Sequence, residues 1–394
     1  MRRFFCIVCL FALLTGCAPA SSTAPLSEST PLAESMAPDT GELHLTSSCN
    51  GEGYFTLWLQ GLTRLDPRDL TAHIACSVSG CDHTGEECEA QVRTFNLVVL
   101  EDAVYTLEYS DGDAGMALMM RDADGANPRL INHVGMWLFR GADEEYLYGF
   151  CDKAFGRVSR TTGAETYLCH DTLFDFVTNG HVVGVWQNAF VCVATDPYEH
   201  ESTRICLLDR DGQITQVASV DAGHLSLGCV ICREGELYYI DAVSGELKAV
   251  RLSDASVRTV TDALCPMGQM PDGSKNYSGL HLSLVGGELI VNVQYIQVDR
   301  SESSTWLVNE DGSIVELPQR QELRNFDPAR DAGYMITRQG QPDPIWICAD
   351  QNGQLIVQNA TQFLDSGPTT IYAVMDAEDY LAGKEIYREF TVPN

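Results

Sequence analysis

A short unit recurs along this chain and restricts its fold more than any other feature. Each copy has an apolar strand, a polar turn containing Asp, Asn or Gly, and a second strand. These turn residues supply left-handed or side-chain-bonded conformations, so each copy predicts a β-hairpin. The seven copies are GLTRLDPRDLTAHIAC, MMRDADGANPRLI, GRVSRTTGAETYLC, CLLDRDGQITQVAS, KAVRLSDASVRTVT, WLVNEDGSIVELPQ and WICADQNGQLIVQN.

Further apolar runs lie between the copies and complete units of four strands, for example ADEEYLYGF, GHVVGVWQ and GELYYID. Dividing residues 51–394 by seven gives roughly 49 residues per unit, close to the ~40 to 50 residues of a propeller blade. Stacking the sheets around an axis covers faces that a single four-stranded sheet leaves exposed. We therefore predict an all-β fold, a β-propeller of seven four-stranded blades. A pair of β-sandwiches or a solenoid is the alternative.

The two ends of the repeat array predict how such a ring closes. The first hairpin lacks strands before it, while TTIYAVMD and KEIYREFTV near the C-terminus lack a hairpin. We expect the GYFTLWLQ segment to pair with strands from residues 370 to 392, which would protect two sheet edges. A single helical turn is expected at residues 378–383.

The first residues have the composition of an export signal. Arg2 and Arg3 precede an apolar run over residues 4–14, which predicts a signal peptide over residues 1–16 that is too short to span a membrane. The sequence Leu-Thr-Gly-Cys that ends at Cys17 resembles the bacterial lipobox. That resemblance implies cleavage before Cys17 and a lipid on its thiol, so we expect a protein anchored to the extracytoplasmic face of the cell membrane.

Residues 17–50 predict a tether between this lipid and the domain at residues 51–394. After Cys17 the segment is rich in Ala, Pro, Ser, Thr and Glu and contains no Lys, Arg or aromatic residue. A segment of this composition buries too little apolar surface to fold by itself.

The charge of the chain restricts its partners. The formal net charge is -30 at pH 7, which repels nucleic acid because such binding requires a basic face. We expect a monomer whose partners are the membrane, through the lipid, and an unknown extracellular ligand or envelope protein.

Three cysteines and a histidine lie within thirteen residues, in the sequence CSVSGCDHTGEEC: Cys76, Cys81, His83 and Cys88. Three thiolates and one imidazole form a complete tetrahedral set for structural zinc. Exported cysteines commonly oxidise, so a disulfide among Cys76, Cys81 and Cys88 is an alternative, and free thiols are a third. No catalytic role is expected for the cluster.

The remaining motifs favour structural roles. The D-x-D-G turns at residues 122–125 and 209–212 predict hairpins and not calcium loops, because Met120 and Leu207 stand where further oxygen ligands would be needed. Isolated histidines such as His181 and His281 are expected to have no ligand or base role. Six further cysteines are expected to pack in strands as small apolar side chains: Cys151, Cys192, Cys206, Cys229, Cys232 and Cys348.

The lipobox-like segment, the tether, the C-x-H element at Cys81 to His83 and the repeats together resemble propeller lipoproteins of Gram-positive anaerobes, which are loosely similar to TolB-like propellers. The segment MDAEDYLAGKEIY is also similar. The resemblance implies a propeller and an anchor but no activity. The sequence contains no linear hydrolase motif, so we expect a ligand- or protein-binding module. The alternative is an extracytoplasmic hydrolase or lyase of glycans or peptides that uses residues of the propeller channel.

Overall fold

The computed structural model describes residues 42–58, 61–83, 85, 88–110, 115–170, 180–195, 203–220, 230–241, 244–262, 264, 277–296, 301–317, 346–351, 353–364, 367–384 and 386–391. All of them belong to one compact unit, Thr40–Asn394. The predicted signal peptide, the proposed lipid site at Cys17 and most of the predicted tether lie outside the described residues.

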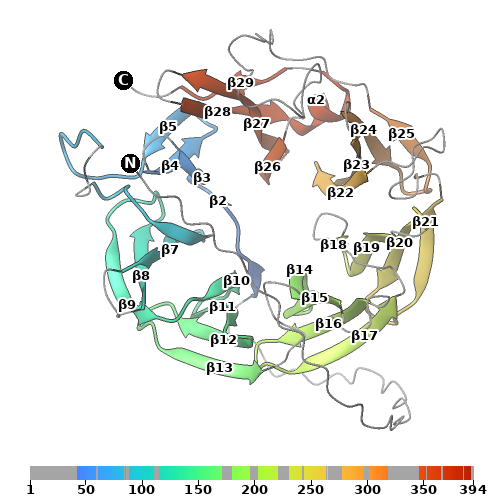
Figure 1. The fold of residues 1–394 in the computed structure, drawn as a ribbon, viewed down its shortest axis with the longest axis horizontal. Coiled ribbons are helices and arrows are strands. Elements are labelled where there is room, and N and C mark those ends of the chain that lie inside the picture. The colour runs from blue at the N-terminus through green and yellow to red at the C-terminus, as the bar shows by residue number, and fades with distance from the viewer. Residues whose placement is uncertain are drawn as a thin grey trace, which may run out of the picture. The chain divides into compact units, whose positions relative to one another are not determined.

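Seven antiparallel sheets follow one another along the chain and form a ring (Figure 1), which confirms the predicted seven-bladed β-propeller. The first strand of each blade lies nearest the centre of the ring and the fourth lies outermost. Blade 1 is β2 (Cys49–Asn50), β3 (Gly53–Trp58), β4 (Gly61–Asp66) and β5 (Thr71–Ile74); blade 2 is β6 (Thr94–Val99), β7 (Ala103–Tyr109), β8 (Met116–Asp122) and β9 (Arg129–Val134); blade 3 is β10 (Leu138–Ala142), β11 (Tyr146–Cys151), β12 (Ala154–Ser159) and β13 (Glu165–His170); blade 4 is β14 (Gly180–Trp186), β15 (Ala189–Thr195), β16 (Thr203–Asp209) and β17 (Ile214–Val220).

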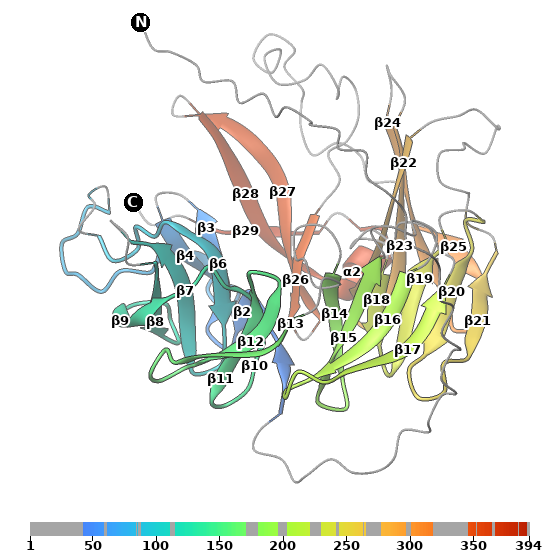
Figure 2. The same cartoon turned by 60° about the horizontal axis from the view of Figure 1, so that its bottom comes forward.

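The other three blades have the same order of strands. Blade 5 is β18 (Val230–Arg233), β19 (Glu236–Ile240), β20 (Leu247–Arg251) and β21 (Val257–Thr261); blade 6 is β22 (Tyr277–Val285), β23 (Glu288–Ile296), β24 (Ser301–Val308) and β25 (Ile314–Glu316); blade 7 is β26 (Trp346–Gln351), β27 (Gln354–Leu364), β28 (Gly367–Asp376) and β29 (Arg388–Glu389). The longest described strands, β27 and β28, project to the same side of the ring as β22 and β24 of blade 6 (Figure 2).

The core is divided into seven apolar clusters, one between each pair of neighbouring blades. Between blades 2 and 3, for example, Trp137 and Tyr105 are almost fully buried. Successive strand residues point to opposite faces, so one strand contributes to the clusters on both sides of its blade. This arrangement explains why the chain needs a closed ring, since an isolated blade would expose two apolar faces.

Six of the seven predicted hairpins join the third and fourth strands of their blades. The seventh, at residues 346–359, instead joins β26 and β27, the first two strands of blade 7. The outer strands of that blade are β28 and β29, connected through α2 (Ala377–Leu381). The expected helical turn at residues 378–383 therefore exists, and it begins one residue earlier and ends two residues earlier.

The predicted pairing that closes the ring is wrong. The GYFTLWLQ segment pairs with β2 and β4 of its own blade, because each end of the repeat array supplies four strands of its own. Blades 1 and 7 meet instead through an isolated parallel bridge between Thr71 and Thr391. The Thr391 amide donates to the Leu70 carbonyl at 2.8 Å, and the Ala72 amide donates to the Thr391 carbonyl at 2.9 Å.

The predicted tether ends too late in the chain. Residues 49–50 form β2, and β1 (His44–Leu45) pairs with β10 as a fifth strand at the inner edge of blade 3. The physical reason is that the innermost strands offer unpaired backbone groups, which this segment can satisfy. Leu43 is 2% exposed and packs between blades 3 and 4.

Further hydrogen bonds hold the segment from Leu43 to Asn50 across several blades. The Leu43 amide donates to Asn188 Oδ1 at 3.2 Å in blade 4, and Asn50 Nδ2 donates to the Leu100 carbonyl at 2.9 Å after β6 of blade 2. The segment therefore connects blades 1 to 4 along their inner edges.

Two of the structural interpretations of single motifs are confirmed. Residues 122–125 and 209–212 form hairpin turns, closed by amide donation from Gly125 to Asp122 and from Gly212 to Asp209. Cys151, Cys192 and Cys206 are buried in the clusters between blades. Cys229 and the side chain of Cys348 lie outside the described residues.

Candidate metal centre and interblade groove

The loop between β5 and β6 brings the four predicted metal ligands together. One ligand atom from each of Cys76, Cys81, His83 and Cys88 lies within 4.8 Å of all the others. Cys88 is buried, and the other three side chains are partly exposed. Gly80 and His83 adopt positive φ values, 76° and 60°, which turn the loop back so that the side chains converge.

Each sulfur accepts a backbone N–H from the residue two positions later. The amide of His83 donates to Cys81 Sγ at 3.4 Å, and the amides of Val78 and Ala90 donate to Cys76 and Cys88. These donors orient the sulfurs inward and favour their charged thiolate form. A disulfide needs no such set of donors, because its sulfurs carry no charge.

The thiols differ in how readily they ionise. Burial opposes the ionisation of Cys76, but the amides of Val78 and Glu89 and the neighbouring thiols lower its pKa below the usual value. Burial raises the pKa of Cys88 to about 11, and the nearby Cys81 and Cys76 thiols contribute to that rise. A divalent cation would allow all three thiols to ionise together, since it compensates the charge of the thiolates.

The distances suit a tetrahedral ion. His83 Nδ1 lies 3.4 Å from Cys88 Sγ. Zinc bonds of about 2.3 Å to sulfur and about 2.0–2.1 Å to nitrogen place two tetrahedral ligands roughly 3.6 Å apart. The residues therefore fit zinc. None of the nine cysteines whose side chains the structure describes forms a disulfide.

The loop also connects two blades. Arg121, a buried side chain of blade 2, donates to the Glu89 carbonyl at 2.8 Å. Leu62 of blade 1 donates its amide to the Ala90 carbonyl at 2.8 Å. The Glu89 carboxylate accepts from the amide and hydroxyl of Ser77, whose N–H and O–H groups lower the pKa of Glu89. An ion in this loop would therefore stiffen the junction of blades 1 and 2.

A second group of titratable side chains lies on the β4–β5 hairpin. Asp66, Asp69 and His73 place ligand atoms within 4.8 Å of one another, but Arg68 already binds both Asp66 carboxylate oxygens, at 2.8 and 2.6 Å. The hydrogen bonds of Arg68 hold the pKa of Asp66 below its usual value. Asp66 is therefore committed to an ion pair and not to a metal.

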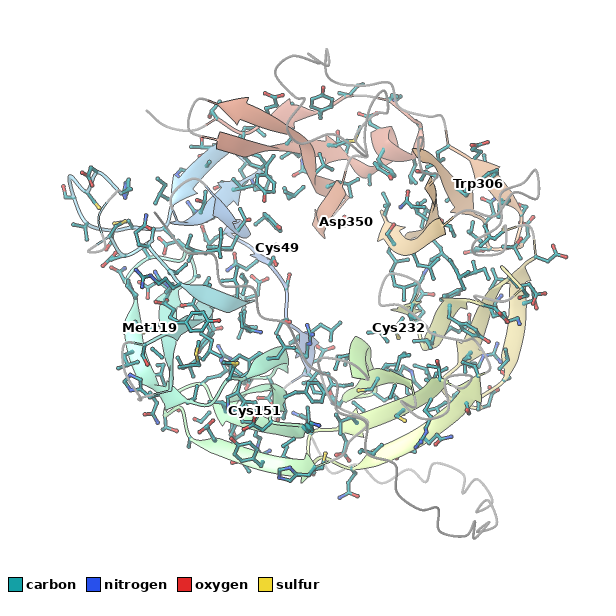
Figure 3. All side chains as sticks on the ribbon, viewed as in Figure 1. Cys49, Met119, Cys151, Cys232, Trp306 and Asp350 are labelled. Atoms are coloured by element: carbon teal, nitrogen blue, oxygen red, sulfur yellow. The ribbon has the colours of Figure 1, made fainter. Side chains whose placement is uncertain are left out.

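The inner edge of the ring was the expected place for an enzyme site. Figure 3 labels Cys49, Cys232 and Asp350 at this edge. Asp350 accepts the amide of Gly286 at 2.7 Å and so joins blade 7 to blade 6. Among the described residues, neither of the two convergent titratable groups lies on an innermost strand. The side chains of His181 and His281 lie outside the described set.

An arginine closes the space between blades 2 and 3. Arg160, the first residue of the β12–β13 turn, binds both oxygens of Asp102 at 2.6 and 2.7 Å. Its Nε donates to the hydroxyl of Tyr105 at 3.2 Å, and its guanidinium lies 5.5 Å from the centre of that ring. Tyr105 is consequently 2% exposed.

A related ion pair lies one blade further on. Arg210 begins the β16–β17 turn and binds Asp143 at 3.2 Å, while Tyr148 donates its hydroxyl to the same carboxylate at 2.8 Å. Tyr148 and Tyr105 occupy equivalent positions in the second strands of their blades. Tyr105 lies two residues after Ala103, where β7 begins to pair with β8, and Tyr148 lies two residues after Tyr146, where β11 begins to pair with β12. Tyr148 is 1% exposed.

Blade 5 has the tyrosine but lacks the arginine from the next blade. Tyr238 lies two residues after Glu236 and so occupies the position of Tyr105 and Tyr148. In blade 6 the residue that corresponds to Arg160 and Arg210 is Glu310. Each of the three follows the residue whose amide closes the outer turn, and in blade 6 that residue is Asn309, which donates to the Ser313 carbonyl. Tyr238 remains partly exposed.

Two cavities adjoin Tyr238, with volumes of about 350 and 210 Å³; the first is lined by residues of blades 4 and 5 and the second by residues of blades 5 and 6. They share Arg233, Glu234 and Tyr238, and together we call them the blade 5 groove. The first cavity is further lined by Trp186, Gly235, Glu236, Arg251 and Ser253, and the second by Arg258, Val260, Glu288, Leu289, Val308, Asn309 and Glu310.

Ion pairs within blade 5 line the groove, and Arg258 also donates to the Tyr238 hydroxyl at 3.4 Å and lies 5.9 Å from the centre of that ring. Arg258 donates to Glu236 at 2.7 Å, and Tyr238 donates to the same carboxylate at 2.9 Å. Arg258 lowers the pKa of Glu236, while burial opposes this change. Gly235, with φ 76°, lies against Trp186, since a Cβ there would stand 2.9 Å from the indole nitrogen.

The sequence prediction named the four side chains that converge in this loop but missed the groove. A signal for it exists in the repeats. The first turn residue of the outer hairpin is Arg160 in blade 3 and Arg210 in blade 4, but Leu252 in blade 5 and Glu310 in blade 6. Comparing the copies position by position would have shown that blades 3 and 4 have an arginine at this position and that blades 5 and 6 do not.

These features define the class: the chain is a seven-bladed β-propeller. No family model matches the chain, and no curated protein matches it. The described part of the chain contains no helix that is long and apolar enough to cross a membrane.

Several solved structures are similar at low identity. An oligogalacturonate lyase in complex with manganese is 11% identical, with a TM-score of 0.43, over 71% of this chain and 72% of that one. Prolyl oligopeptidase B from Galerina marginata is 8% identical, with a TM-score of 0.48, over 89% of this chain and 51% of that one. A putative 6-phosphogluconolactonase from Bacteroides uniformis is 12% identical, with a TM-score of 0.40, over 89% and 95%. The resemblance to TolB-like lipoproteins therefore stays a prediction beyond the fold.

Proposed function

We propose that this propeller is an extracytoplasmic, membrane-anchored binding module whose blade 5 groove takes a ligand or partner protein. The observation that supports this function is the groove itself. The turns of blades 3 and 4 supply Arg160 and Arg210 to carboxylates of the preceding blade, whereas blade 6 has Glu310 at that position and two cavities adjoin Tyr238. Aromatic and charged side chains gathered around one open space are typical of a recognition site.

The test of this function is retention of an envelope component. The purified full chain, immobilised in detergent, is exposed to envelope extract of the producing cells, and the retained material is compared with that on the Glu310→Arg variant. Retention that this variant loses supports a binding role for the groove. Equal retention by both forms, or none, contradicts it.

We also propose that Cys76, Cys81, His83 and Cys88 hold one structural zinc ion. Four protein ligands leave no open coordination position, so such an ion stabilises the loop and activates no water. The backbone N–H donors to the three sulfurs support this assignment over a disulfide, as does the presence of three thiols where a disulfide would use two.

The zinc proposal is tested by metal analysis and thiol counting on the full chain purified without chelator. We expect about one zinc per chain, strongly reduced in His83→Ala and retained in His73→Ala, a histidine of blade 1 outside this cluster. Thiols of the loop should become reactive only after chelation. Absence of zinc together with one reactive thiol in the loop would establish the disulfide, and three reactive thiols without zinc would exclude both structures.

The location rests on the first residues of the sequence. We expect the lipid on Cys17 to be the membrane anchor, because the residues around it match the lipobox. Cells that produce Cys17→Ala should release the protein from the membrane fraction. Unchanged retention in that fraction would contradict the proposed anchor.

A further inference from the structure

A β-bulge gives Arg140 an unusual position at the inner edge of the ring. The pairing of β10 with β11 passes from Phe139 and Gly149 directly to Gly141 and Tyr148, so Arg140 is the extra residue of the bulged strand. β10 is the first strand of blade 3 and lies near the centre of the ring (Figure 1). A bulge leaves its extra residue out of the ladder and can redirect the side chain, and bulges are common beside functional sites.

Three other first strands have a bulge against their second strand, and none of them places a charged residue there. The extra residues are Phe95 in β6, Val183 in β14 and Cys348 in β26. Val183 packs against the apolar cluster between blades 4 and 5. The position is therefore suited to an apolar side chain, and Arg140 is the one charged residue among the four.

The guanidinium of Arg140 has no hydrogen bond and no ion pair within the part of the chain that the structure describes. Arg140 is only partly exposed, and burial lowers its pKa without any carboxylate close enough to oppose the change. The two buried arginines differ, since Arg121 pairs with Glu108 at 3.2 Å and Arg160 pairs with Asp102 at 2.6 Å. The fold therefore pairs its buried guanidinium groups and leaves that of Arg140 available.

This arrangement costs stability. A partly buried charge loses contact with water, and here no opposite charge compensates that loss. The chain has 55 acidic residues against 25 Lys and Arg residues, so carboxylates are abundant elsewhere. The backbone of Arg140 is held, because the Thr46 amide donates to its carbonyl at 3.0 Å, whereas its guanidinium contacts no acceptor. A residue kept at a cost to stability is typical of a functional site.

We propose that Arg140 binds the carboxylate or phosphate group of a small ligand at the inner edge of blade 3. The guanidinium donates two parallel N–H groups to two oxygens of that group, a geometry that suits both kinds of anion. Because the side chain is partly exposed, a small solute can reach it. The site lies on the first strand of blade 3, whereas the groove is lined by residues of blades 4, 5 and 6, so the inference goes beyond the proposed function and does not depend on it.

The test measures the melting temperature of the full chain in sodium acetate, sodium phosphate or sodium chloride at equal ionic strength. The first two probes distinguish a carboxylate ligand from a phosphate ligand, and chloride is the reference. A Kd of about 5 mM predicts a rise of roughly 2 °C at ~50 mM anion for a unit of this size. We expect such a rise with at least one of the two probes. No rise with either would overturn the proposal.

Two variants of Arg140 separate ligand binding from a structural role. Arg140→Met removes the charge and keeps an unbranched side chain, so it should abolish the rise with the anion. In chloride it should melt at the same or a higher temperature than the natural chain, because it removes an unpaired charge. Arg140→Lys keeps the charge but not the fork of donors and should show a smaller rise. Melting of Arg140→Met below the natural chain in chloride would assign Arg140 a structural role and would overturn the proposal.

The matched control is Arg388→Met, which removes an exposed arginine from the outermost strand of blade 7. This variant should keep the full rise with the anion. Equal losses in Arg388→Met and Arg140→Met would show attraction by charge alone and would also overturn the proposal. Glu310→Arg changes only the blade 5 groove and should keep the rise, so failure of the groove to retain a partner and failure of anion binding are separate results.

Discussion

Phe390 should be a main contributor to closure of the ring. It is 7% exposed and packs in the cluster between the last and first blades, with Leu65 and Ala72 on one side and Ile356 and Val374 on the other. Among the described residues of this junction the backbone contact is one parallel bridge, so side-chain packing must provide much of the stabilisation.

The cost of Phe390→Ala follows from this packing. Buried Phe→Ala substitutions cost about 3–5 kcal/mol, and the remaining exposure of Phe390, 7%, places it at the lower end of this range. We therefore expect about 3 kcal/mol. With an unfolding entropy of ~2.1 cal/mol/K per residue, a unit of this size should lose about 4 °C in Tm.

Calorimetry and denaturant titration of the full chain measure this effect. The matched control is Ile386→Ala, in the same C-terminal segment, whose side chain is 57% exposed and should change stability by less than about 0.5 kcal/mol. Similar small effects for both substitutions would refute the idea that Phe390 holds blades 1 and 7 together.

Three further outcomes are expected. Arg160→Ala should lower the free energy of unfolding by about 2–3 kcal/mol, because two carbonyls and the Tyr105 hydroxyl lose a buried donor. The denaturant midpoint measures this change, and a loss below about 0.5 kcal/mol would contradict a stabilising role of Arg160 between blades 2 and 3. Because Arg258 lowers the pKa of Glu236, this carboxylate stabilises the fold above its usual pKa of 4.5 and loses that contribution as the pH falls through the lower folded value; the stability advantage of the natural chain over Glu236→Gln should therefore shrink between pH 5 and pH 3. Burial raises the pKa of Cys192, which is fully buried, so its thiol should react with Ellman's reagent only after unfolding, and reaction in the native state would argue against the packing between blades 3 and 4.

Local features of the sequence were sufficient for the hairpins and for the convergence of four side chains in the loop between β5 and β6. The turn residues at 122–125 and 209–212 dictate tight reversals through conformations that depend on neighbouring residues alone. Likewise, Cys76 and Cys88 lie close in the chain, so a compact loop brings them together without help from distant blades. Structure that depends on such neighbouring residues can be predicted from the sequence.

The junctions between blades were not predictable in the same way. The closing bridge at Thr391 and the fifth strand at residues 44–45 depend on which distant edges remain unpaired after the sheets have formed. The groove also depends on contacts between distant residues, since Glu310 and Tyr238 line one cavity although they lie 72 positions apart in the sequence.

The sequence by itself therefore determined an all-β chain of seven hairpin repeats and a loop that gathers three cysteines and a histidine, because turns and strand alternation are set by residues close together in the chain. The tertiary structure alone decided how the ring closes, that the segment before residue 51 joins the inner edge, and which interblade space stays open. Those outcomes depend on contacts between strands of different blades, whose geometry arises only when each blade packs against its neighbours.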